Sequence, residues 1–394
     1  MKPTTKPKIL ILSGALGDGH KQAARAIREA ALADHPGMEV EEVDYMEWTH
    51  PRLHVAGKFF YEQWMKKLPS LYGYLFQRTR GDNLFSSLVK RAKTYSLERM
   101  QQLLMEKQPS VVVSTFPLAA AAMSAFKAQG LTGLPAVTVI TDHTDHSFWI
   151  HPHTDRYIVG SDPVRKALLR KGVPADRISA TGIPVRLPYH RSYDRVQLRR
   201  RHGFDRTRPT VLVMGGGLGM IDKDFVGLLK SGQFAGDAQF IVVCGRNVKL
   251  REQLEEKLTH AAGRVHVLGY VEHVHELMAL SDLIVTKPGG LTTSEALSLE
   301  LPMLLFKPLP GQEKDNAAYL AGIGAAVEAG SAAELARILT GLLTERERLD
   351  GMKRQAALFR PNSPSPDAVR AILEAKHAGF PVWEEASEPV CAKA

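Results

Sequence analysis

Cysteine and long apolar runs are both scarce in this 394-residue sequence. The two cysteines, Cys244 and Cys391, are far apart in the chain, and Cys244 follows an apolar run that should be buried. This excludes a disulfide framework and fits a reducing cytosol. No window comes near the roughly 20 apolar residues that a membrane-spanning helix needs. The apolar run at residues 9–12 is too short for a signal peptide. We therefore expect a soluble protein or one attached only to a membrane surface.

Length and charge indicate two domains of different character. A chain of 394 residues, 44% hydrophobic and 24% charged, can form two ordinary α/β domains. The net charge of +9 is uneven: residues 1–190 hold 25 Lys and Arg against 17 Asp and Glu, whereas the remainder holds 26 against 25. A basic half joined to a neutral half indicates that one domain meets an anionic surface.

The most informative stretch runs from residue 285 to residue 297. A buried strand should end at its start, and a helix should begin near Ser294. Between them, Gly289 and Gly290 let the backbone approach a ligand closely. The neighbouring threonines and serine can cap the helix, whose first amide groups form an anion site. Glu295 can accept hydrogen bonds from a ribose diol. The pattern favours a nucleotide diphosphate, although an ordinary capped βα turn explains it as well.

The first predicted strand covers residues 8–12, and a second glycine loop follows it. It has glycines at positions 14, 17 and 19 and ends at His20, just before a predicted helix. The spacing is not that of a dinucleotide loop, and only Asp44 approaches the position of a ribose-binding acid, so NAD or FAD is disfavoured. His20 should lie at the carboxyl edge of the sheet, where ligands bind in such folds. The alternative is that His20 only caps or packs on the helix.

Residues 58–107 differ in composition from the sequence around them. They hold ten Lys and Arg against four Asp and Glu, together with nine aromatic residues. This combination suits a membrane–water interface, where rings lie at headgroup depth and cations meet anionic lipid. The residues predicted to contact the membrane or the acceptor are Trp64, Lys66, Lys67, Lys90 and Arg91. No nucleic-acid motif is present and no nucleic-acid partner is expected. The alternative is a set of helices packed on the sheet with solvated basic faces.

Histidines and aspartates gather in the stretch from Thr141 to His153. Four histidines and two aspartates there suggest a metal, but the spacings match no metal-binding helix and Pro152 favours a loop. We therefore predict a polar active-site loop without a metal, and Asp142 is a candidate catalytic residue within it.

Two series of alternating strands and helices organise the whole chain. The first ends near residue 186, a charged stretch follows, and the second begins at Thr210 with a strand and the glycine loop 215–219. The predicted domains are residues 1–190, a linker at 191–208, residues 209–360, and a terminal helix and tail at 361–394. Such a pattern, without a tandem repeat, predicts two doubly wound α/β domains facing one cleft.

Taken together, seven motifs resemble one enzyme family. They are GALGDGH at 14–20, TDHTDHSFWIHP at 141–152, TGIPVR at 181–186, MGGGLGM at 214–220, CGRN at 244–247, TKPGGLTTSEAL at 286–297 and GQEKDN at 311–316. In this order they resemble the monogalactosyldiacylglycerol synthases and processive diacylglycerol glucosyltransferases, inverting relatives of the lipid II N-acetylglucosaminyltransferase. The resemblance covers roughly residues 8–360 and implies the GT-B fold, with two Rossmann-like domains.

The resemblance also implies roles for individual residues. His20 would lie near the acceptor hydroxyl as catalytic base, with Asp142 as the alternative. Val271 would pair with uracil through its backbone, and Gln312 and Asn316 would touch the sugar. Gly217 stands where the lipid II relatives have serine, so backbone amides must replace a side-chain contact there. The complete implied donor site is Arg186, Gly215, Gly216, Gly217, Gly219, Arg246, Asn247, Val271, Gly289, Gly290, Thr292, Glu295, Gln312 and Asn316.

The activity that the resemblance implies is transfer of glucose or galactose from a UDP-sugar to diacylglycerol, either as a single sugar or as several added in succession. No cofactor is expected because the UDP-sugar is a substrate, and helix amides can stabilise the leaving diphosphate without a metal. The enzyme would lie on the inner face of the cell membrane, on the cytoplasmic side. The alternatives are a UDP-sugar 2-epimerase, a transferase with another lipid acceptor, and a membrane sensor that binds a UDP-sugar without turnover.

Overall fold

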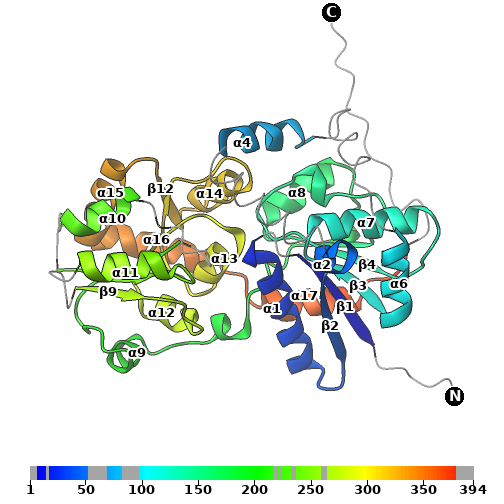
Figure 1. Cartoon of the computed structure of the whole chain (residues 1–394), viewed down its shortest axis with the longest axis horizontal. Helices are drawn as coiled ribbons and strands as arrows, with labels where there is room; N and C mark the ends of the chain where they lie inside the picture. Colours follow the sequence, from blue (N-terminus) through cyan, green and yellow to red (C-terminus); the bar gives the residue numbers. More distant parts are fainter. Residues whose placement is uncertain are drawn as a thin grey trace, which may run out of the picture. The chain divides into compact units, whose positions relative to one another are not determined.

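The computed structural model of the chain describes residues 7–14, 17–51, 69–81, 97–215, 221, 223–231, 237–258 and 264–378. It divides into two compact units, the first formed by Met1–Arg186 together with Ser363–Ala394 and the second by Leu187–Asn362. In each unit a parallel sheet is flanked by helices (Figure 1). The predicted pair of doubly wound α/β units is confirmed.

The first unit is built on a six-stranded parallel sheet. Its strand order is β2-β1-β3-β4-β5-β6. The strands are β1 (Lys8–Ser13), β2 (Glu39–Asp44), β3 (Val111–Ser114), β4 (Ala136–Val139), β5 (Arg156–Ile158) and β6 (Ile178–Ser179). The central strands are almost entirely apolar, as expected where helices cover both faces of a parallel sheet. Ile9 to Leu12 of β1 are fully buried and pair in register with β3, with Ile9 opposite Val111.

The helices of the first unit include one from the far end of the chain. They are α1 (Asp18–Asp34), α2 (Tyr45–Thr49), α4 (Pro69–Arg78), α6 (Leu97–Lys107), α7 (Pro117–Ala128), α8 (Asp162–Arg170) and α17 (Pro364–Leu373), with 3-10 turns η1 (Ser147–Trp149) and η2 (Ala175–Arg177). The buried face of α1 consists mostly of alanine, which allows α17 to pack closely against it. The hydroxyl of Ser365 donates to the carbonyl of Val185 at 2.5 Å, which fastens the start of α17 to this unit.

The second unit repeats the architecture with a different strand order. Its sheet is also parallel and six-stranded, in the order β12-β11-β10-β7-β8-β9. The strands are β7 (Thr210–Met214), β8 (Gln239–Val243), β9 (Val265–Leu268), β10 (Leu283–Thr286), β11 (Met303–Phe306) and β12 (Ala326–Ala329). The helices are α9 (Arg195–Arg201), α10 (Lys223–Ser231), α11 (Val248–Lys257), α12 (Val274–Leu280), α13 (Gly290–Ser298), α14 (Gln312–Gly322), α15 (Ala332–Thr344) and α16 (Arg346–Phe359), with the 3-10 turn η3 (Leu187–His190).

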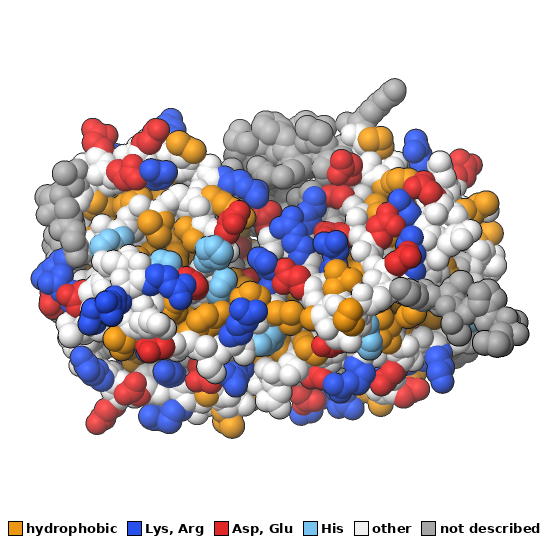
Figure 2. Space-filling model, turned by 90° about the horizontal axis from the view of Figure 1, so that it is seen from below, with side chains coloured by type: hydrophobic (Ala, Val, Ile, Leu, Met, Phe, Trp, Pro, Cys, Tyr) orange, Lys and Arg blue, Asp and Glu red, His pale blue; other side chains and the backbone are white. Residues whose placement is uncertain are grey.

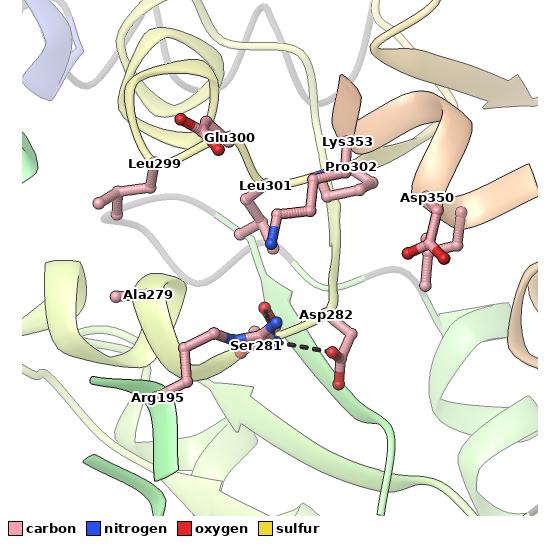
Figure 3. Close-up of a pocket in the computed structure, with 11 residues that line it drawn as sticks. Arg195, Ala279, Ser281, Asp282, Leu299, Glu300, Leu301, Pro302, Asp350 and Lys353 are labelled. Atoms are coloured by element: carbon pink, nitrogen blue, oxygen red, sulfur yellow. Dashed lines mark hydrogen bonds and ion pairs between the residues drawn. The ribbon is translucent and has the colours of Figure 1, made fainter. Parts of the chain in front are cut away.

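The charged stretch that the sequence marks as a linker is an integral part of the second unit. Arg195 and Arg199 of α9 both bond to the carboxylate of Asp282, at 2.6 and 2.7 Å, and the amide of Thr210 donates to the same group at 2.7 Å. Figure 3 shows the bond between Arg195 and Asp282. Asp282 directly precedes β10. The cluster therefore joins α9 to the amino ends of β7 and β10, and partner arginines lower the pKa of Asp282 even though burial acts in the opposite direction.

The predicted domain boundaries differ from the observed boundaries at both ends of the second unit. The prediction separated residues 191–208 as a linker and residues 361–394 as a terminal segment. In the structure, α9 packs on α12 within the second unit, and α17 lies in the first unit. The Asp282 cluster accounts for the first difference, and the alanine face of α1 for the second.

Candidate functional site

Both sheets have a topological switch point, where successive crossovers run to opposite sides. In the first sheet the chain leaves β1 for β2 and then returns to β3 on the other side of β1. In the second sheet the strands β7 to β9 extend in one direction, and β10, next to β7, begins the other. Ligands of doubly wound folds bind beyond the carboxyl ends of the strands at such points. His20 follows β1, and the turn at residues 287–290 follows β10, so both predicted loops lie at switch points.

His20 is held by two threonines that follow neighbouring strands. The hydroxyl of Thr115, after β3, donates to the carbonyl of His20 at 3.0 Å. The hydroxyl oxygen of Thr141, after β4, lies 3.1 Å from Nδ1 of the imidazole. The rings of Phe116 and Trp149 have their centroids 5.3 and 5.9 Å from that of His20. The imidazole is therefore fixed in position rather than free to rotate.

The glycine loop before His20 is needed for this packing. A Cβ atom built on Gly14 would lie 2.6 Å from Cγ of Phe116, which is closer than carbon atoms can approach. Gly17, the residue before α1, has φ 93° and ψ 150°, a conformation that favours glycine. These two glycines allow the chain to turn from β1 into α1 with His20 in the first turn.

Burial changes the acid–base behaviour of His20. It lowers the pKa of the imidazole from 6.5 to about 4, although a hydrogen bond with the Thr115 backbone acts in the opposite direction. His20 is therefore neutral at physiological pH and has a nitrogen lone pair that can accept a proton. If Nδ1 donates its proton to Thr141, Nε2 is the accepting atom.

The histidine-rich loop holds α4 in place through side-chain contacts. Arg80, just after α4, bonds to the Asp145 carboxylate at 2.8 and 3.1 Å. Nε2 of His146 lies 3.0 Å from the carbonyl of Phe76 and 3.2 Å from the hydroxyl of Thr79. Across the part of the chain that the structure describes, no three His, Cys, Asp or Glu side chains are placed to hold a metal ion.

The other members of this loop are also engaged within the first unit. The imidazole of His143 lies 3.1 Å from the hydroxyl of Ser161, and burial lowers its pKa to about 3. The ring of His151 contacts the carbonyl of Phe148 at 3.0 Å. Asp142 is partly exposed and directly follows Thr141, and its catalytic role stays a prediction.

In the second unit, the first amide groups of α13 follow the turn after β10 and have no side-chain cap. Gly289 precedes α13 and no side chain caps the helix. The predicted capping by threonine and serine is therefore wrong: Thr293 donates to the Gly289 carbonyl at 2.9 Å and Ser294 to the Gly290 carbonyl at 2.7 Å. These short side chains bond back to the preceding turn, as they often do inside helices. The first amides of α13 remain for an anion.

Space and burial around this turn also bear on ligand binding. A Cβ atom built on Gly289 would meet nothing within 4 Å, so the backbone there is open to an incoming group. Glu295, in the second turn of α13, is only 8% exposed. Thr292 lies in the first turn of α13, between these two residues.

The remaining predicted donor residues follow β7, β8 and β9. Gly215 directly follows β7, whereas Gly216, Gly217 and Gly219 lie outside the described residues. Asn247 caps α11, since its side chain accepts from the amide of Leu250 at 3.1 Å. The guanidinium of Arg246 lies 5.2 Å from the ring centroid of Tyr270, which precedes Val271. The described members of this set therefore lie at the carboxyl edge of the second sheet, namely Gly215, Arg246, Asn247 and Val271.

Three further predicted donor residues have different surroundings. Gln312 begins α14, and Asn316, one turn later, is completely buried and donates to the carbonyl of Pro288 at 2.9 Å. Arg186 belongs to the first unit, where its Nε donates to the Glu29 carboxylate of α1 at 2.8 Å. The contact of each with a donor stays a prediction.

Thr141 and Tyr270 are the site residues that sequence reasoning missed. Each directly precedes a predicted site residue, Asp142 and Val271 respectively, and each comes just after a strand. That position at the end of a parallel strand is the signal that could have identified them.

The predicted membrane residues Trp64, Lys66, Lys67, Lys90 and Arg91 lie outside the described residues. Of the same segment, α4 exposes Leu71 and Tyr74, at 45% and 56%. Arg78 donates to the Tyr74 hydroxyl at 3.0 Å. Within the described ranges, no helix is both long and apolar enough to cross a bilayer.

A cavity of about 90 Å³ lies at the opposite edge of the second sheet (Figure 3). It is lined by Arg195 and Asp282, by residues preceding β11, and by Asp350 and Lys353 of α16. Because it opens at the amino ends of the strands, away from the predicted donor residues, and because its Arg195–Asp282 pair supports α9, we assign it a structural role.

Comparisons with known proteins match a separate family model to each of the two α/β units. The family model of monogalactosyldiacylglycerol (MGDG) synthase matches residues 20–185, and that of glycosyl transferases group 1 matches residues 194–359. A processive diacylglycerol beta-glucosyltransferase from Bacillus cytotoxicus is 32% identical over 379 residues, covering 94% of this chain and 95% of the relative.

Solved structures show the same fold at low identity. MurG of Acinetobacter baumannii has a TM-score of 0.57 and 14% identity, covering 93% of this chain and 99% of that one. HepE of Anabaena in complex with UDP-glucose has a TM-score of 0.55 and 15% identity, with coverage of 93% and 99%. The chain is a glycosyltransferase with the GT-B fold, as predicted. Its full-length match assigns it more narrowly: it belongs to the family of the processive diacylglycerol beta-glucosyltransferases.

Proposed function

We propose that this chain transfers glucose from UDP-glucose to the hydroxyl group of diacylglycerol, with inversion at the anomeric carbon. The observation that carries the proposal is the match to the diacylglycerol beta-glucosyltransferases, which extends over nearly the whole length of both chains. The names of these relatives favour glucose over galactose as the sugar. They also support addition of further sugars to the first product.

The proposed reaction uses His20 as general base. The acceptor hydroxyl attacks the anomeric carbon, its proton passes to the neutral imidazole, and the bond from the anomeric carbon to the diphosphate oxygen breaks as UDP leaves. Burial keeps His20 unprotonated, and Thr141 holds the ring in place. Asp142, on the same loop, is the alternative base.

The proposed donor site lies at the carboxyl edge of the second sheet. The amide groups at the start of α13 would receive the diphosphate, and the positive end of the helix dipole would stabilise the charge that develops on it. Gly289 leaves room for close approach of the phosphates. We propose that neither a cofactor nor a metal is required, because these groups supply the stabilisation that the leaving group needs.

The proposed partner surface is anionic membrane lipid, met by residues 58–107 on the cytoplasmic side of the cell membrane. The exposed Leu71, Tyr74 and Arg78 of α4 are of the types that bind at a membrane interface. On the face shown in Figure 2, by contrast, Lys and Arg side chains are interspersed with Asp and Glu side chains. A surface of mixed charge is not expected to bind anionic lipid. Residues 58–107 carry an excess of positive charge, which supports the proposal that this segment meets the membrane.

The proposal is tested by incubating the purified protein with diacylglycerol vesicles and either UDP-glucose or UDP-galactose. We expect β-glucosyl diacylglycerol and an equal amount of UDP, identified by mass spectrometry and by the proton NMR signal of the anomeric centre. Conversion of the sugar to its epimer without a glycolipid would support the epimerase alternative. Binding of the UDP-sugar without any product would support the sensor alternative.

A further inference from the structure

Helix α14 fastens two loops at the carboxyl edge of the second sheet. The loops follow the neighbouring strands β10 and β11, and α14 begins directly after the second of them. The amide of Leu309 donates to the Glu313 carboxylate at 2.7 Å. One turn later, the side-chain amide of Asn316 donates to the carbonyl of Pro288 at 2.9 Å. Glu313 thus holds the loop after β11, and Asn316 holds the loop after β10.

The loop after β10 is the turn that presents the amides of α13. The amide of Gly289 donates to the Lys287 carbonyl at 2.9 Å, so Pro288 is at the centre of a tight turn. By accepting from Asn316, the Pro288 carbonyl fixes the orientation of the Pro288–Gly289 peptide unit. That peptide unit comes immediately before the first helical residue, Gly290. The direction of the first amides of α13 therefore depends on this bond.

The loop after β11 has an unfavourable backbone conformation that needs such support. Lys307 has φ 46°, in the left-handed region, and Gly311 has φ 109° and ψ −140°, a region open mainly to glycine. Burial raises the pKa of Glu313, while the Leu309 amide and the nearby Lys287 act in the opposite direction. The first two turns of α14 thus make both bonds, from Glu313 to the loop after β11 and from Asn316 to the loop after β10.

We propose that Asn316 is a positioning residue, which acts on the donor through the diphosphate turn and not by touching the sugar. The inference rests on the proposed function, since it concerns the same UDP-sugar site. Its basis is that the side chain is completely buried and its amide group is already bonded to the turn. A contact with the sugar, as the family resemblance implies, would require this completely buried side chain to become accessible to the ligand.

The distinction can be measured because UDP has the diphosphate but no sugar. Asn316→Ala and the isosteric Asn316→Asp remove the donor to Pro288, so both should weaken binding of UDP and of UDP-glucose by the same factor, roughly ten- to a hundredfold. Gln312→Ala is the matched control, one turn earlier on α14. It should weaken only UDP-glucose. Isothermal titration calorimetry gives the dissociation constants, and thermal unfolding shows that each variant is folded.

Loss of UDP-glucose affinity with unchanged UDP affinity in the Asn316 variants would overturn the inference. If both variants fail to fold, the side-chain amide NMR signal of Asn316 in the parent protein decides. That signal should move on addition of UDP alone, and a signal that moves only with UDP-glucose would overturn the inference. Parent protein that binds neither compound would instead contradict the proposed function, so the two failures are distinguishable.

Discussion

The hydroxyl oxygen of Thr141 lies 3.1 Å from Nδ1 of His20, although 121 residues separate them in the chain. The contact joins the loop after β4 to the first turn of α1, across the switch point of the first sheet. The same loop holds α4 through Asp145 and His146. The proposed base and the proposed lipid-facing helix are therefore supported by one loop.

Thr141→Val removes the hydroxyl while keeping the shape of the side chain. Without this contact the His20 imidazole can rotate or change tautomer, so we expect kcat to fall about tenfold, the equivalent of one neutral hydrogen bond. The dissociation constant of UDP-glucose should not change. Thr141→Ser, which keeps the hydroxyl, should recover most of the rate. Equal losses in the valine and serine variants would show that packing, and not the hydrogen bond, is important.

Glu295→Gln tests the ribose contact without creating a cavity at this buried position. A carboxylate that accepts from a diol forms charge-assisted hydrogen bonds, and losing one or two should cost roughly 1.5–3 kcal/mol each. We expect calorimetry to show weaker binding of UDP, with thermal unfolding little changed. Unchanged UDP affinity would count against the assignment of Glu295.

Stability should depend on pH through His20 and His143, whose imidazoles the fold desolvates. In the folded protein the pKa of His20 is about 4 and that of His143 about 3, both below the ordinary value of 6.5. At intermediate pH the unfolded chain therefore binds protons that the folded protein does not. The free energy of unfolding should decrease as pH falls from about 6.5 toward 4, by at most about 1.4 kcal/mol per pH unit for each proton.

Chemical denaturation across this pH range measures the effect. His143→Gln should make the dependence less steep, because one of the protons taken up on unfolding is lost. A free energy of unfolding that stays constant in the parent protein would contradict the burial of these imidazoles.

The membrane proposal predicts a selective defect. Reversing the charges of Lys66, Lys67, Lys90 and Arg91 should abolish sedimentation with phosphatidylglycerol vesicles, since each cation contributes about 1 kcal/mol at most and salt weakens it. Activity on a detergent-solubilised, short-chain acceptor should persist. The control reverses four exposed cations of α16, and should still sediment. These cations are Arg346, Arg348, Lys353 and Arg354.

If the charge-reversed protein sedimented like the parent, the segment would have no part in docking. If it misfolded, the interpretation of residues 58–107 as helices packed on the sheet would be favoured.

Local sequence patterns predict the central strands and both switch-point loops. Buried parallel strands such as β1 and β10 are short apolar runs followed by glycine, which is a distinctive pattern. By contrast, β2 escapes prediction because it is an edge strand with four acidic residues, Glu39, Glu41, Glu42 and Asp44. The strand order also cannot be inferred from such patterns, and it alone places Thr115 and Thr141 beside His20.

Long-range polar contacts account for the rest of what the sequence does not predict. Asp282 bonds to Arg195 and Arg199, which lie more than eighty residues earlier, so a charged stretch that resembles a linker becomes part of a folded unit. Asn316 can be matched to a family position, but its burial and its bond to Pro288 depend on how α14 packs. Residue type and spacing therefore indicate a candidate site, whereas tertiary packing decides which contacts each side chain makes.

The rate of glucosyl diacylglycerol formation by His20→Ala tests the central claim most directly. Removing a general base typically slows a reaction 10²- to 10⁴-fold. We predict a loss of that size in kcat, with the UDP-glucose dissociation constant nearly unchanged because the diphosphate turn of the proposed donor site lies in the other unit. A variant that kept most of its rate would contradict the assignment of His20 as base and make Asp142 the leading candidate.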